Sequence, residues 1–146
     1  MGPETATSLE VRRVIKARPD AVFRAWTEPD QLMRWSCPEG GSIEEAAVDL
    51  RIGGAYRLRM KDGTGKIHTA IGVYREIDPP HRLVYTWDWE EEGSRMGETI
   101  VTVQFNDRGA ATEVVLTHEQ FPAPEARDGH AQGWESLLTK LERVFE

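Results

Sequence analysis

The sequence contains a single cysteine, Cys37, so the chain cannot form an internal disulfide bond. It has no apolar run near the roughly 20 residues that span a membrane, and no signal peptide begins it. Basic residues are outnumbered, 18 against 25 acidic ones, and the net charge of −7 argues against binding nucleic acid, whose binders carry a basic surface. We therefore expect a cytoplasmic protein with no membrane span and no nucleic-acid partner.

Motifs for metals and cofactors are also missing. None of the four histidines has the spacing to cysteine or carboxylate residues that is typical of a metal site. His118-Glu119 begins like a zinc-protease motif, but Pro122 stands where the second histidine belongs. The chain has no phosphate-binding glycine loop, no dinucleotide fingerprint and no nucleophile elbow. We expect neither a metal nor an organic cofactor.

The bulk composition indicates one globular domain. The chain has 146 residues, of which 39% are hydrophobic and 29% are charged. A chain of this length buries about two thirds of its unfolded surface, enough for a core and a cavity. The polar start predicts a flexible tail at residues 1–8, followed by one domain at residues 9–146.

Alternating apolar and polar residues predict β-strands. The clearest alternation is in 82–90, where Tyr85 and Trp87 point to one side and Thr86 to the exposed side. Turn residues, among them a break at 38–41, separate seven such segments: about 9–17, 43–49, 55–61, 67–77, 82–90, 98–106 and 111–118. Short connections between the last six predict an antiparallel meander with one wet face and one packed face.

Helix signals occur in three places. Residues 18–20 open a first helix, and a second short helix starts near Thr27, whose hydroxyl can cap it. Apolar residues at three- and four-residue spacing predict a long helix at 124–145. Gly129 and Gly133 lie inside this helix, which indicates either a close approach to the sheet or space left for a ligand.

Five segments carry a resemblance to a known superfamily: VRRVIKARPDAVFRAWTEPDQLMRW, VDLRIGGAYRLRM, GVYREIDPPHRLVYTWDW, TEVVLTHEQFP and HAQGWESLLTKLERVF. In this order they resemble the START-like, or SRPBCC, superfamily and, within it, the carboxy-terminal-domain homologues of the activator of the ninety-kDa heat-shock chaperone's ATPase. The resemblance covers residues 9–146. It implies an α+β helix-grip fold, in which a curved antiparallel sheet, two short helices and a long C-terminal helix enclose a cavity. Because this fold hosts carriers, receptors and enzymes, it does not fix the function.

The resemblance also implies which residues line the cavity, and the strand alternation selects the same strand residues. The predicted ligand-binding set comes from the second helix, the sheet and the long helix: Trp35, Tyr56, Leu58, Met60, Ile71, Val73, Tyr85, Trp87, Val103, Phe105, Leu116, His118, His130 and Trp134. No catalytic residue is assigned. His118 and His130 can each act as ligand anchor, acid or base, or can be core histidines bonded to a neighbouring group. We expect His130 to be the polar group that a ligand meets.

Three functions remain open. The leading hypothesis is a binding domain for a small apolar or aromatic molecule, because the inward face is rich in aromatics and has few polar groups. The second is a cyclase or hydrolase that uses His118 or His130 as general acid–base. The third is a protein-binding module, either a co-chaperone or a homodimer. The eukaryotic co-chaperone carries a separate amino-terminal domain with an asparagine- and tryptophan-rich motif that has no counterpart here, so the family name alone does not predict a chaperone partner.

Overall fold

A computed structural model describes residues 7–37 and 40–146. Its elements are β1 (Leu9–Ile15), α1 (Pro19–Thr27), α2 (Pro29–Leu32), β2 (Ser42–Val48), β3 (Ala55–Lys61), β4 (Ile67–Asp78), β5 (Arg82–Trp89), the 3-10 helix η2 (Glu92–Ser94), β6 (Thr99–Arg108), β7 (Ala111–Glu119) and α3 (Pro124–Val144). Most of the predicted tail and half of the predicted break at 38–41 lie outside the described residues. The carbonyl oxygen of Thr7 accepts a hydrogen bond of 3.0 Å from the N–H of Phe121, so the end of the tail is tied to the domain.

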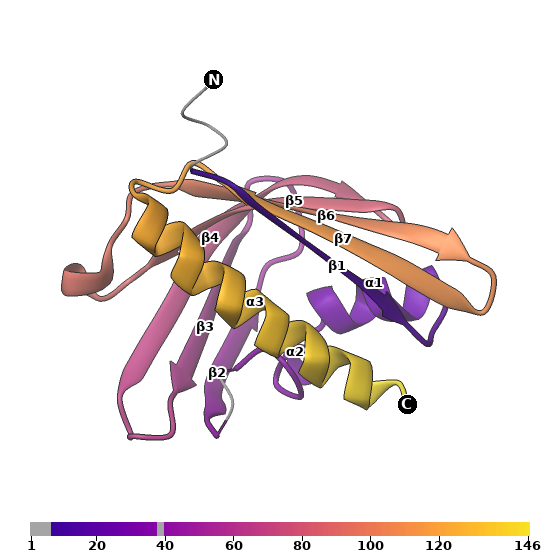
Figure 1. Ribbon diagram of the computed structural model, residues 1–146, viewed down its shortest axis with the longest axis horizontal. Coiled ribbons are helices and arrows are strands. Elements are labelled where there is room, and N and C mark those ends of the chain that lie inside the picture. The colour runs from indigo at the N-terminus through magenta and orange to yellow at the C-terminus, as the bar shows by residue number, and fades with distance from the viewer. Residues whose placement is uncertain (1–6, 38–39) are drawn as a thin grey trace.

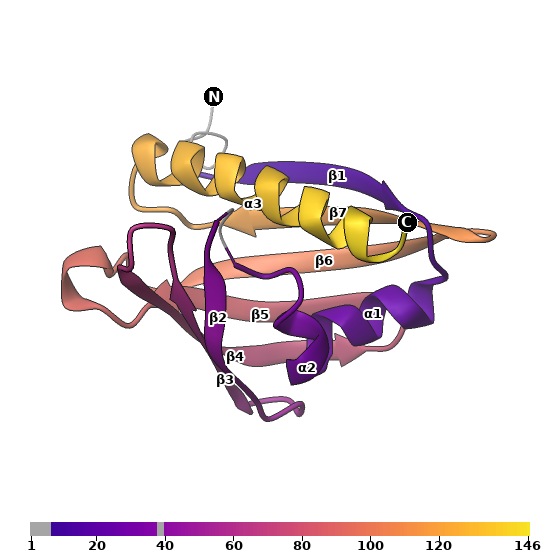
Figure 2. The same cartoon turned by 90° about the horizontal axis from the view of Figure 1, so that it is seen from below.

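The strands form one sheet of seven strands in the order β1-β7-β6-β5-β4-β3-β2. Every neighbouring pair is antiparallel, and β2 to β7 follow one another as the predicted meander, while β1 pairs with β7. The sheet is strongly curved, and α3 runs diagonally across its concave side (Figures 1 and 2). This is the helix-grip fold that the sequence predicts.

The two short helices close one end of the concave face. Phe23 and Trp26 of α1 are buried, and their rings meet the Phe105 ring of β6 at centroid distances of 5.3 and 5.7 Å. The predicted cap at Thr27 is wrong, because Thr27 ends α1 and its hydroxyl donates to the carbonyl oxygen of Phe23 at 3.0 Å. Glu28 precedes α2 and makes no side-chain cap.

The two halves of α3 differ in how they meet the sheet. Trp134, Leu138 and Leu141 are buried and anchor the C-terminal half. Gly129 and Gly133 of the N-terminal half are exposed, and a Cβ atom built on either one would meet nothing within 4 Å. The glycines therefore leave space beside the helix and do not serve a close approach. In the part of the chain that the structure describes, no helix is long and apolar enough to cross a membrane.

Candidate functional site

The inner face of β5 supplies the first part of the site. Tyr85 and Trp87 are buried, as the strand alternation predicts. The predicted exposure of Thr86 is wrong, because this residue is only 6% exposed. Its hydroxyl accepts a hydrogen bond of 2.9 Å from the N–H of Val73, and its carbonyl oxygen accepts one of 2.6 Å from the hydroxyl of Tyr56. The first bond joins β5 to β4 where the regular ladder between them is interrupted, and the second joins β5 to β3.

The strand β4 presents the opposite face from the one predicted. Tyr56 of β3 lies directly opposite Gly72, and directly opposed residues share a sheet face. Gly72 and its alternating neighbour Tyr74 therefore face inward, while Ile71 and Val73, predicted to line the cavity, face outward. A Cβ atom on Gly72 would overlap the carbonyl oxygen of Thr86 and the Tyr56 ring, so this position needs glycine.

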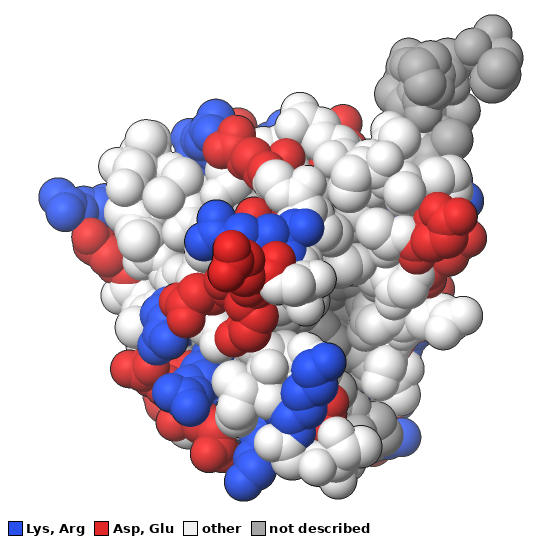
Figure 3. Space-filling model, turned by 90° about the vertical axis from the view of Figure 1, so that its left-hand side faces the viewer, with Lys and Arg blue, Asp and Glu red and all other residues white. Residues whose placement is uncertain are grey.

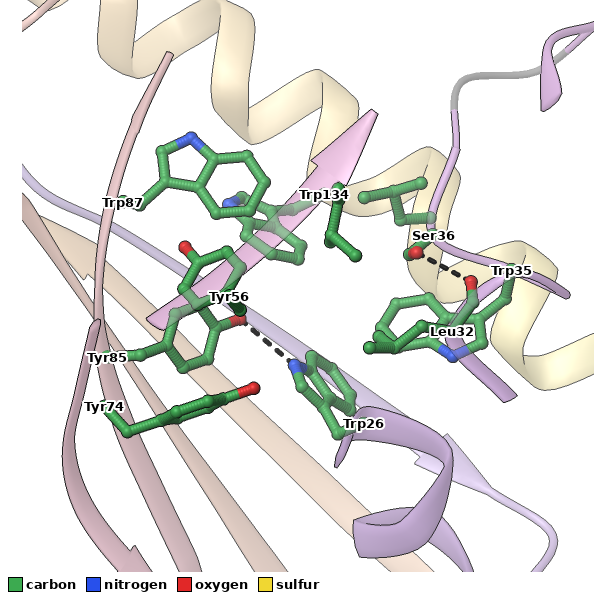
Figure 4. Close-up of a pocket in the computed structure, with 11 residues that line it drawn as sticks. Trp26, Leu32, Trp35, Ser36, Tyr56, Tyr74, Tyr85, Trp87 and Trp134 are labelled. Carbon is green, nitrogen blue, oxygen red and sulfur yellow. Dashed lines mark hydrogen bonds between the residues drawn. The ribbon is translucent and has the colours of Figure 1, made fainter. Parts of the chain in front are cut away.

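Aromatic side chains from the sheet and helices enclose a central cavity, drawn in Figure 4. It is lined by eleven residues: Trp26, Leu32, Trp35, Ser36, Tyr56, Leu58, Tyr74, Tyr85, Trp87, Trp134 and Leu137. Its volume is about 30 Å³, which is room for about two water molecules. The side chains thus fill most of the space between the sheet and the helices, and this cavity alone cannot hold an organic ligand.

A larger groove adjoins the cavity, between the N-terminal half of α3 and the neighbouring ends of β3, β4 and β5. Its volume is about 440 Å³, and it is lined by Met60, His68, Trp87, Trp89, Glu125, Ala126, Gly129, His130, Gly133, Trp134, Ser136 and Leu137. Trp87, Trp134 and Leu137 border both the groove and the cavity. The open space beside the two glycines of α3 is part of this groove.

The structure separates the fourteen predicted lining residues into three groups. Eight border the cavity or the groove: Trp35, Tyr56, Leu58, Met60, Tyr85, Trp87, His130 and Trp134. Four are buried without bordering either space: Val103, Phe105, Leu116 and His118. Ile71 and Val73 border a depression on the outer face of the sheet. Among the lining residues that the prediction missed are Trp26, Leu32, Tyr74 and Trp89. The apolar sides of the short helices and the alternation of β5 signalled three of these four.

His118 has no free ring nitrogen. Its Nδ1 accepts a hydrogen bond of 3.1 Å from the indole N–H of Trp134. The proton of the neutral ring is therefore on Nε2, which lies 2.8 Å from the hydroxyl oxygen of Thr99. That hydroxyl in turn donates to the carbonyl oxygen of Trp87. Burial, with a smaller effect of neighbouring His130, lowers the pKa of His118 to about 2, so the imidazole is neutral and acts as a core residue.

His130 borders the groove, but its ring nitrogens also have partners within the protein. Nδ1 donates to the carbonyl oxygen of Ala126 at 2.8 Å, and Nε2 accepts from the indole N–H of Trp89 at 3.3 Å. Burial lowers the pKa of His130, which favours the neutral ring. The two histidines are thus hydrogen-bonded neutral groups, an arrangement that suits binding better than acid–base catalysis.

The groove carries little charge. Glu125, which is exposed, contributes the single carboxylate of its lining, and no lysine or arginine belongs to that lining. Burial raises the pKa of Tyr56, Tyr74 and Tyr85 in the adjoining cavity, so these hydroxyls stay protonated. Among the described residues, no three histidine, cysteine or acidic side chains are grouped to hold a metal ion. On the side of the molecule shown in Figure 3, acidic and basic side chains are interspersed, and the described residues there form no continuous basic area.

Several known proteins are similar to this chain. A protein from Chromobacterium violaceum has a TM-score of 0.87 at 27% identity, and the match covers 96% of this chain and 97% of that one. A protein from Rhodobacter sphaeroides has a TM-score of 0.82 at 30% identity, covering 98% and 94%. The AHSA1 protein from Silicibacter pomeroyi has a TM-score of 0.83 at 26% identity, covering 94% and 96%.

No curated protein matches the chain, but a family model supports the relationship that these structures indicate. A family model described as Activator of Hsp90 ATPase homolog 1-like protein matches residues 16–146, nearly the whole domain. The match agrees with the resemblance drawn from the five sequence segments and with the helix-grip fold. The chain therefore belongs to the Activator of Hsp90 ATPase homolog 1-like family of START-like proteins.

Proposed function

We propose that this protein binds a small, largely apolar or aromatic molecule in the groove between α3 and the sheet. The observation that carries the proposal is the open space beside Gly129 and Gly133. The groove volume of about 440 Å³ falls in the range of about 300–1,000 Å³ that small-molecule sites have. The central cavity of about 30 Å³ does not take the ligand by itself and forms the floor of the site.

The walls of the groove support an apolar ligand. Trp87, Trp89 and Trp134 present aromatic surface to it, and Met60 and Leu137 add aliphatic surface. Burying apolar ligand surface against such walls is favourable by about 25 cal/mol per Å². The polar groups that border the groove are few, and two of them, the indole N–H of Trp89 and Nε2 of His130, already bond to each other.

Filling the groove from the helix tests the proposal. Gly133→Leu places a large side chain in the space that ligand would occupy, and it removes a glycine from a helix interior, so we expect the fold to persist. Gln132→Leu is the matched control, because Gln132 is exposed on the same helix and does not border the groove.

The readout is native mass spectrometry of freshly purified protein, followed by calorimetric titration of the compound that co-purifies. We expect wild type and Gln132→Leu to carry and rebind the compound and Gly133→Leu to lose it. Equal binding by Gly133→Leu would place the ligand elsewhere and contradict the proposal. A wild-type protein that carries no compound and binds no aromatic probe would contradict it as well.

A further inference from the structure

One indole in the site lacks a hydrogen-bond partner. Of the five tryptophans, four donate their N–H to an acceptor in the protein: Trp26 to Tyr85, Trp35 to Ala25, Trp89 to His130 and Trp134 to His118. Nε1 of Trp87 is the one buried side-chain nitrogen or oxygen without a partner in the described part of the chain. Buried donors are almost always paired, so an unpaired one at the wall of a groove calls for a physical explanation.

The position of this donor points toward the groove. Trp87 borders both the central cavity and the groove. Figure 4 shows its nitrogen on the edge of the ring turned away from Tyr56 and Tyr85, and therefore away from the tyrosine side of the small cavity. On the groove side, the rings of Trp89 and His130 lie at centroid distances of 5.4 and 6.4 Å from the Trp87 ring.

The Trp89 ring, which packs against the Trp87 ring, is weakly held. Trp89 is half-buried, and the hydrogen bond that its indole donates to His130 is long, 3.3 Å. Trp89 also lies at the end of β5, next to the loop that contains η2. A ligand that enters the groove can therefore reach the nitrogen of Trp87 when the half-buried Trp89 ring moves aside.

We infer that the ligand is an uncharged aromatic molecule that carries a hydrogen-bond acceptor, such as a carbonyl oxygen, and that the indole N–H of Trp87 donates to this acceptor. The inference rests on the proposed function and adds to it the polarity of the ligand. Neutrality follows from the lining, which offers no lysine or arginine to an anion and a single exposed carboxylate, Glu125, at the groove. An acceptor follows from the unpaired donor.

A pair of isosteric probes isolates the acceptor. Benzophenone carries a carbonyl group where 1,1-diphenylethylene carries a carbon–carbon double bond, and the two have nearly the same shape. Dissociation constants for both are measured by calorimetry with wild type, Trp87→Phe and Trp89→Phe. Trp89→Phe is the matched control, because it changes an indole at the same groove and leaves the N–H of Trp87 in place. The ratio of the two constants cancels effects of shape and hydrophobicity.

We expect the ratio to change by about tenfold, against benzophenone, between wild type and Trp87→Phe, and to stay within about twofold in Trp89→Phe. A ratio that is the same in wild type and Trp87→Phe would overturn the inference while leaving the proposed function intact. Failure of both probes to bind wild type would overturn the proposed function itself.

A second measurement uses wild type alone and so does not depend on whether a variant folds. The Trp87 indole resonance in a ¹H–¹⁵N spectrum of wild type should move downfield on adding benzophenone and not on adding 1,1-diphenylethylene, because only the ketone can accept its proton. Sequence-specific triple-resonance assignment distinguishes it from the other four indoles. An unmoved Trp87 resonance with saturating benzophenone would exclude the hydrogen bond.

Discussion

The indole N–H of Trp134 on α3 donates a hydrogen bond of 3.1 Å to Nδ1 of His118 on β7, and both residues are buried. This bond fixes the tautomer of His118 and directs its remaining proton toward the hydroxyl of Thr99. It also ties the long helix to the sheet at the point where the anchored half of α3 begins. The imidazole predicted to bind a ligand thus holds the floor of the site in place.

Removing the Trp134 donor should destabilise the fold. Trp134→Phe leaves Nδ1 of His118 buried without a partner, so we expect it to lower the free energy of unfolding by about 1–3 kcal/mol, measured by urea denaturation. Trp134→Ala should cost about 3 kcal/mol or somewhat more, near the low end for a buried tryptophan because its ring borders a cavity and a groove. Trp89→Phe is the control, with an expected loss of about 1 kcal/mol or less. Equal losses in Trp134→Phe and Trp89→Phe would show that the buried bond contributes nothing.

Stability should fall as the solution becomes mildly acidic. The pKa of His118 is about 2 in the folded protein, below its ordinary value of 6.5, so the unfolded chain takes up a proton that the folded protein does not. Its contribution to stability is complete above pH 6.5 and is lost as the pH falls toward 2. The lowered pKa of His130 acts in the same direction.

The slope gives this prediction a magnitude. One proton bound only by the unfolded chain lowers the free energy of unfolding by about 1.4 kcal/mol for each pH unit below the unfolded pKa. We expect a slope of at least this size between pH 6 and pH 5 in urea denaturation series. In His118→Gln the slope should be smaller by about 1.4 kcal/mol per pH unit, the effect of one proton. A His118→Gln variant with the wild-type slope would contradict the assignment of that proton.

Two glycine substitutions should have opposite effects. Gly72→Ala forces a methyl group into the carbonyl oxygen of Thr86 and the Tyr56 ring, so we expect a loss of about 3 kcal/mol or more. Gly133→Ala adds a methyl group to open space in a helix and should stabilise the fold by about 0.5–1 kcal/mol. Thermal and urea denaturation of the two variants measures both changes. A tolerated alanine at Gly72 would mean that β4 does not approach β5 as closely as described.

An anionic ligand should bind poorly. 4-Benzoylbenzoate differs from benzophenone by one carboxylate, for which the groove lining offers no lysine or arginine, so we expect its dissociation constant to be at least tenfold higher, or about 1.4 kcal/mol. Glu125→Lys should recover part of this difference, about two- to fivefold, with Gln132→Lys outside the groove as the control. Both titrations use calorimetry. Tighter binding of the carboxylate to wild type would contradict the uncharged character of the site.

The positions of the elements could be predicted from the sequence because the strands alternate cleanly and the turns between them are short. Each strand begins and ends within about two residues of its predicted bounds, as in β3, where both ends agree. The inward face of β3 and β5 could be predicted for the same reason, since Tyr56 and Trp87 are large and apolar. The family resemblance then supplied the placement of α3 across the concave face.

The face of β4 could not be predicted from hydrophobicity. Ile71 and Val73 are the more apolar residues of this strand, yet Gly72 faces inward, because the ring of Tyr56 on the neighbouring strand occupies the space above it. If the large Tyr56 of β3 had been paired with the small Gly72 of β4, the inward face of β4 would have been predicted correctly. Thr86 escaped prediction because its burial depends on two hydrogen bonds across the irregular part of the sheet.

The division of α3 into two halves separates the residues that hold the fold together from those that border the proposed ligand site. Leu138 and Leu141 hold the C-terminal half to the core, and Arg13 of β1 bridges the carboxylates of Glu135 and Glu142 along it. The N-terminal half borders the groove and contributes little to that core. Mutations near its glycines can therefore reshape the groove while the domain keeps its stability, so that the proposed binding site can change its preference on an unchanged scaffold.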